Sequence, residues 1–90
     1  MLFRSLPDAA NGLGVVLVQQ QQAAEAIPWL QIAAADPAFV EAQLNLGIAF
    51  QQTGDTARAR TQYQRVVSSA RSHSRERDAA QALLKQLDRR

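Results

Sequence analysis

The feature that most constrains the fold is a pair of glycines inside otherwise helical sequence, Gly14 and Gly47, which lie 33 residues apart. Each follows a leucine, so Leu13-Gly14 in the first half matches Leu46-Gly47 in the second. A glycine inside a helix costs about 1 kcal/mol relative to alanine. Two of them at matched positions therefore indicate a shared packing requirement, in which a second helix approaches too closely for a side chain.

The match continues at the same offset beyond the glycines. Ala26 aligns with Ala59, and Leu30 aligns with Tyr63. Glycine and alanine are 12 residues apart in both copies. We expect each copy to be a pair of antiparallel helices, in which the glycine of one helix meets the alanine of the other at the crossing.

Composition and capping residues predict helices along nearly the whole chain. Ala, Gln, Leu, Arg and Glu dominate, and the alternation of β-branched residues typical of strands is lacking. Asp36-Pro37 and Gly54-Asp55 each predict a helix start, since aspartate caps free amides and proline suits a first turn. We therefore predict an all-α chain of about five helices, near 7–20, 23–35, 37–53, 55–70 and 74–88.

Two positions leave the boundaries of the first two helices open. Residues 19–22 are four glutamines with no glycine, proline or Asx residue among them, so these helices could run together. Pro28 removes an amide hydrogen bond from the second helix and should kink or shorten it.

The residues at these spacings resemble the tetratricopeptide-repeat pattern. The second copy carries it in Leu46, Gly47, Phe50, Ala59 and Tyr63, whereas the first copy resembles it more loosely, with a glutamine at the turn position that Gly54 holds in the second. The resemblance implies a right-handed superhelix of antiparallel helix pairs in a single domain over 1–90. Repeat one would span about 7–39, repeat two about 40–72, and a capping helix about 74–88.

Composition also excludes several kinds of site. The chain has no cysteine and one histidine, His73, which no catalytic partners accompany, so we expect no catalytic residue, no metal and no cofactor. No apolar run approaches the length of a membrane span and the start is not a secretory leader, which favours a cytoplasmic location. Nine of the ten Lys+Arg follow residue 55, yet no aromatic residue interleaves Arg71, Arg75, Arg77 and Lys85. Nucleic-acid or polyanion binding is therefore the alternative with least support.

The resemblance implies an interaction surface. In this family the first helix of each pair lines a concave groove that binds a peptide or a helical segment. Carried over by position, the groove residues are Asn11, Val15, Val18, Gln19, Leu44, Asn45, Ile48, Gln51 and Gln52. The Lys and Arg side chains with which some relatives hold a C-terminal carboxylate are missing, because Asn11 and Val15 stand in their places. The alternative is that some of these residues pack against the final helix or a second chain.

Self-association or a scaffold role is the second hypothesis, because two repeats leave both ends of the stack open. Apolar residues at helical spacing in the last helix predict that it covers one end, on the side of Val66 and Val67; they are Ala80, Leu83, Leu84 and Leu87. The other end has no such helix, and Leu2, Phe3 and Leu6 lie there. These residues could fold back over it, contact another copy in a homodimer, or mark where a longer array was cut.

Overall fold

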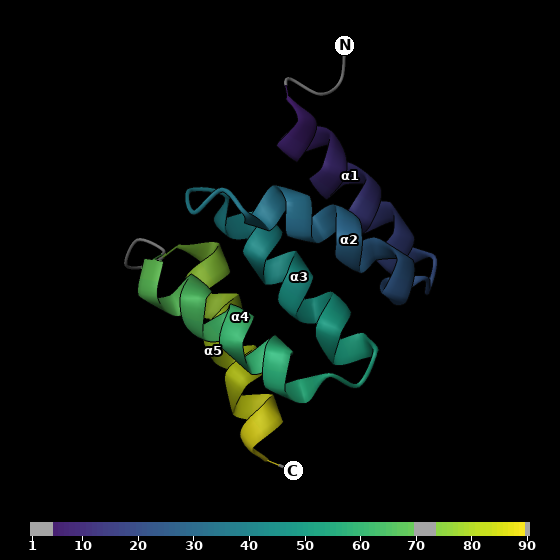
Figure 1. Cartoon of the computed structure of the whole chain (residues 1–90). Helices are drawn as coiled ribbons and strands as arrows, with labels where there is room; N and C mark the ends of the chain where they lie inside the picture. The colour runs from purple at the N-terminus through teal and green to yellow at the C-terminus, as the bar shows by residue number, and fades with distance from the viewer. Residues whose placement is uncertain (1–4, 70–73, 90) are drawn as a thin grey trace.

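The structure is a computed structural model that describes residues 5–69 and 74–89; within them the chain forms five α-helices and no strand. The helices are α1 (Leu6–Gln19), α2 (Ala23–Ala34), α3 (Val40–Gln52), α4 (Thr56–Ser69) and α5 (Arg75–Asp88). Helix α1 packs on α2, α3 packs on both α2 and α4, and α5 packs on α4 (Figure 1). The predicted all-α, helical-repeat architecture is confirmed.

Side-chain caps begin three of the helices. The Ser5 hydroxyl accepts a hydrogen bond from the Asp8 amide at 3.3 Å, and the Ser74 hydroxyl accepts one from the Arg77 amide at 3.1 Å. Asp55 accepts from the Arg58 amide at 3.1 Å, as the Gly54-Asp55 pair predicts. Each cap satisfies an amide that the first turn of a helix leaves without a partner.

The predicted start of the third helix is wrong. Helix α3 begins at Val40. The Asp36 carboxylate accepts a hydrogen bond from the Ala38 amide, two residues further along, at 2.9 Å and does not reach the first turn of α3. Asp36 and Pro37 therefore form a local turn instead of a helix cap, a conformation that aspartate readily supports. The turn brings Phe39 against the core, and the buried Gln43 amide donates to the carbonyls of Asp36 and Pro37 at 3.4 Å each.

The first helix of each pair ends in the same backbone motif. Gly54 has φ +86°, and Gln21, 33 residues earlier, has φ +65°. After Gln21 the Gln22 amide donates to the Leu17 carbonyl at 2.8 Å, and after Gly54 the Asp55 amide donates to Phe50 at 2.9 Å. These bonds end each helix in a left-handed residue. The glutamine run therefore separates α1 from α2, and α2 itself continues through Pro28.

The left-handed conformation of Gln21 generates a stability prediction. A side chain in this conformation costs about 1–2 kcal/mol, which glycine avoids at a smaller entropic cost. Gln21→Gly should therefore raise the free energy of unfolding in urea by about 0.5–1 kcal/mol, and the matched Gly54→Gln should lower it by a similar amount. Equal or lower stability of Gln21→Gly would contradict this account of the turn.

Close approach at the two interior glycines organises each helix pair. A Cβ atom built on Gly14 would lie 2.5 Å from the Leu30 side chain, and one built on Gly47 would lie 2.5 Å from Tyr63. Leu30 and Tyr63 are both fully buried. In both pairs, as expected from the sequence, there is no room for a side chain at the glycine.

The partner expected for the glycines needs correction. Ala26 and Ala59 are fully buried, but the atoms nearest to the two glycines belong to the large residues four positions further along. A helix places residues four apart on one face, so each alanine lies one turn away from the large side chain. The repeat therefore pairs glycine with a bulky side chain.

Burial gives Tyr63, the only tyrosine of the chain, an unusual titration. Its hydroxyl donates to Gln51 Oε1 at 2.7 Å, and burial raises its pKa from 10.0 to about 12. Between these two values the unfolded chain ionises the hydroxyl and the folded chain does not. The free energy of unfolding should therefore fall as the pH rises through this window.

Phenolate absorbance tests this directly, because no other tyrosine contributes. We expect a midpoint of about 12 in the folded protein and about 10 in concentrated urea. Tyr63→Phe provides the blank. A midpoint near 10 under both conditions would show that the ring is not buried beside Gly47.

Helix α5 covers the far side of the second pair. Ala80 and Leu87 are buried, and Leu83 and Leu84 pack partly buried against the core, so the predicted apolar face turns inward. An ion pair joins Arg60 of α4 to Asp88 of α5. Residues 70–73, which include His73, lie outside the described part of the chain.

Candidate functional site

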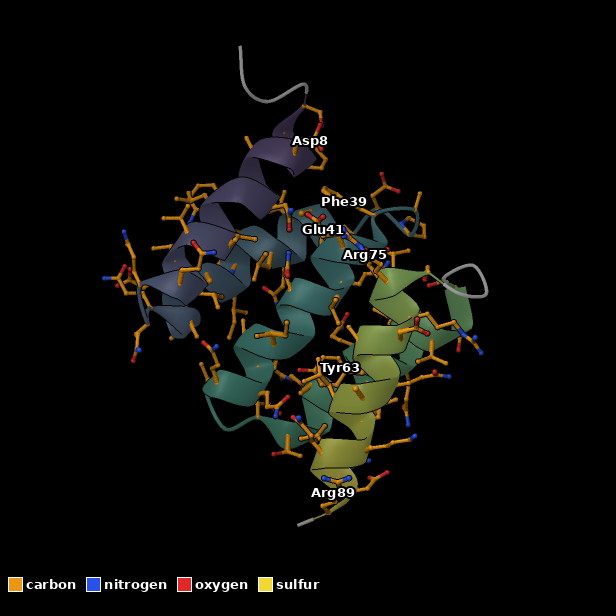
Figure 2. The ribbon with its side chains drawn as sticks, turned by 180° about the vertical axis from the view of Figure 1, so that it is seen from behind. Asp8, Phe39, Glu41, Tyr63, Arg75 and Arg89 are labelled. Atoms are coloured by element: carbon orange, nitrogen blue, oxygen red, sulfur yellow. The ribbon has the colours of Figure 1, made fainter. Side chains whose placement is uncertain are left out.

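The first helices of the two pairs lie side by side, and a groove runs between them. Figure 2 shows α1, α3 and α5 across one face of the molecule, and Figure 1 shows α2 and α4 on the other. A pocket of about 180 Å³ opens between α1 and α3. We call it the α1–α3 groove, and its lining residues are Val15, Val18, Gln19, Asn45 and Ile48. These five residues were all among the nine predicted from the sequence.

The groove continues toward the α1–α2 turn. Val18 also lines a second pocket, of about 300 Å³, together with Gln21, Ala23 and Gln52. Gln52, another of the nine residues, thus lies next to the groove. Gln21 and Ala23 were not predicted, because they reach this position only through the turn that the left-handed Gln21 creates.

A chain of side-chain hydrogen bonds orients the polar side of the groove. Asn45 Nδ2 donates to Asn11 Oδ1 at 3.0 Å, and Asn11 Nδ2 donates to Glu41 Oε2 at 2.8 Å. An ionised carboxylate only accepts, so Glu41 turns the Asn11 amide group toward itself and leaves the Asn11 oxygen for Asn45. Asn11 is mostly buried, and Glu41 lies at the start of α3 (Figure 2).

This arrangement leaves the Asn45 carbonyl oxygen available. Among the described residues no donor reaches Asn45 Oδ1, while its amide group is held by Asn11. The groove thus combines an apolar floor from Val15, Val18 and Ile48 with one fixed hydrogen-bond acceptor. Glu41 has a role here that sequence reasoning missed, since only the contact across α1 and α3 reveals it.

Three predicted residues do not line the pocket. Asn11 lies beneath it and positions Asn45. Leu44 is half-buried and packs against the core, and Gln51 accepts the Tyr63 hydroxyl. Leu44 and Gln51 are therefore engaged in contacts within the molecule and do not line this pocket.

Comparison with known proteins agrees with the two helix pairs. A family model described as tetratricopeptide repeat matches residues 2–39, and another with the same description matches residues 41–73. The chain belongs to the tetratricopeptide repeat family. Neither the curated proteins nor the solved structures contain a significant match to it.

Each matched stretch of this tetratricopeptide repeat protein contains one helix pair, α1 with α2 or α3 with α4. Repeats of this family generally mediate interactions between proteins and are typically not catalytic. In the part of the chain that the structure describes, no helix combines the length and hydrophobicity needed to cross a bilayer.

Proposed function

We propose that the chain is a non-enzymatic interaction module that binds a peptide or helical segment of another protein in the α1–α3 groove. The observation that carries this proposal is the convergence of residues from two repeats on one pocket. Val15 and Val18 come from α1, Asn45 and Ile48 come from α3, and the Asn45 oxygen has no described donor.

The chemistry of the groove suits a segment with an apolar side chain next to an exposed amide. The aliphatic floor takes a leucine or aromatic anchor, and the Asn45 oxygen accepts a peptide N–H. Gln19 and Gln52 stand at the exposed rim, where their amide groups can pair with further backbone groups.

Two alternatives differ in their support. Self-association through the open N-terminal end is favoured by exposed apolar residues and is developed below. Polyanion binding has less support, since two of the seven basic residues that the structure describes are already in ion pairs, Arg58 with Asp55 at 3.6 Å and Arg60 with Asp88.

Selection from a library of displayed peptides, followed by anisotropy titration of the selected peptides, tests groove binding. Ile48→Glu places a charge on the apolar floor and should weaken binding by at least about tenfold. The matched control is Ile32→Glu on α2, an exposed position away from the groove that should leave affinity unchanged. Circular dichroism establishes that both variants fold.

Signals from the Asn45 side-chain amide provide an independent readout by nuclear magnetic resonance. They should shift when a selected peptide binds, together with the methyl signals of Val18 and Ile48. Equal affinity of the two glutamate variants, with shifts confined to other helices, would contradict the proposal.

A further inference from the structure

The exposed large apolar residues of the described chain are confined to the first helix pair. Leu6, Leu13 and Val16 lie on α1, and Trp29 and Ile32 lie on α2, each 39–63% exposed. Single exposed apolar residues are common on protein surfaces, but a cluster on one face indicates a contact surface.

The internal repeat shows which way the three residues of α1 face. At an offset of 33 they correspond to Phe39, Leu46 and Ala49. Leu46 and Ala49 are buried on helix α3, which packs on α2, and Phe39, directly before α3, is partly buried. The same face is therefore covered in the second pair and open in the first.

The two residues of α2 belong to the same side. They correspond to Gln62 and Arg65, which face Gln31 and Ala34 of α2 across a pocket between α4 and α2. On α4 the two residues that face the preceding helix layer are thus polar, whereas the equivalent two residues of α2 are apolar. We call this side of the first pair the N-terminal edge, formed by Leu6, Leu13, Val16, Trp29 and Ile32.

The opposite end of the molecule offers no second apolar surface. Helix α5 covers α4, and the described residues of α3 to α5 expose no large apolar side chain. A head-to-tail contact would place the N-terminal edge against polar residues. Pairing of the edge with itself buries apolar surface on both sides and closes as a two-fold dimer.

Charge is compatible with this pairing. The described residues of the first pair, 5–35, carry Asp8 and Glu25 and no Lys or Arg. From these described residues each copy therefore brings only two carboxylates and no cation to the contact. The remaining repulsion is between exposed groups and is screened by salt.

We propose that the N-terminal edge docks on the same edge of a second copy, so that the exposed apolar side chains of two α1/α2 layers cover one another. A layer of two 14- and 12-residue helices has a footprint of about 400 Å². That is below the roughly 800 Å² per partner of a standard interface, so the dimer dissociates readily at low concentration. This inference does not depend on groove binding.

Sedimentation velocity of the full chain between about 10 and about 300 µM, the range for a weak interface, tests the pairing. The wild type should shift from monomer to dimer, and added NaCl should favour the dimer. Trp29 is the only tryptophan, so its emission should move to shorter wavelength over the same range. This readout needs no substitution.

The two isoleucine variants then separate this surface from the groove. Ile32→Glu should remain monomeric and keep peptide affinity, whereas Ile48→Glu should dimerise as the wild type does and lose peptide affinity. A wild type that stays monomeric with constant Trp29 emission overturns the inference. Equal dimerisation of wild type and folded Ile32→Glu overturns it as well.

Discussion

The rest of the structure depends on the contact between a glycine in the first helix of each pair and a bulky residue in the second. Gly14 receives the Leu30 side chain and Gly47 receives the Tyr63 ring, with too little space for a methyl group in either case. Because protein interiors are close-packed, this contact sets how near the two helices lie. Glycine destabilises the helix interior at both matched positions, and at both the close contact leaves no room for a larger residue.

The same register determines the groove. Val15 follows Gly14 and Ile48 follows Gly47, and successive residues of a helix point about 100° apart. When the glycines face the second helix of each pair, the residues after them turn toward the channel between α1 and α3. The spacing that makes the repeat pack therefore also brings two aliphatic side chains from distant segments into one pocket.

Much of this arrangement could be predicted from the sequence, and the exceptions have physical causes. Periodicity, caps and the glycine spacing predict the five helices and the inward face of α5. The start of α3 was missed because Asp36 bonds to the nearby Ala38 amide, a local alternative to capping. The Glu41–Asn11–Asn45 chain was missed because it joins two helices 30 or more residues apart, and residue spacing carries no signal for it.

Gly47→Ala tests the central contact most directly, because the sign of its effect is decisive. With Tyr63 against Gly47, the added methyl group should lower the free energy of unfolding in urea by about 1–3 kcal/mol. The control Gly12→Ala should instead raise it by up to about 1 kcal/mol, since the equivalent position of the second repeat holds the larger Asn45. If Gly47→Ala is as stabilising as Gly12→Ala, helices α3 and α4 do not approach at Gly47 and the account is wrong.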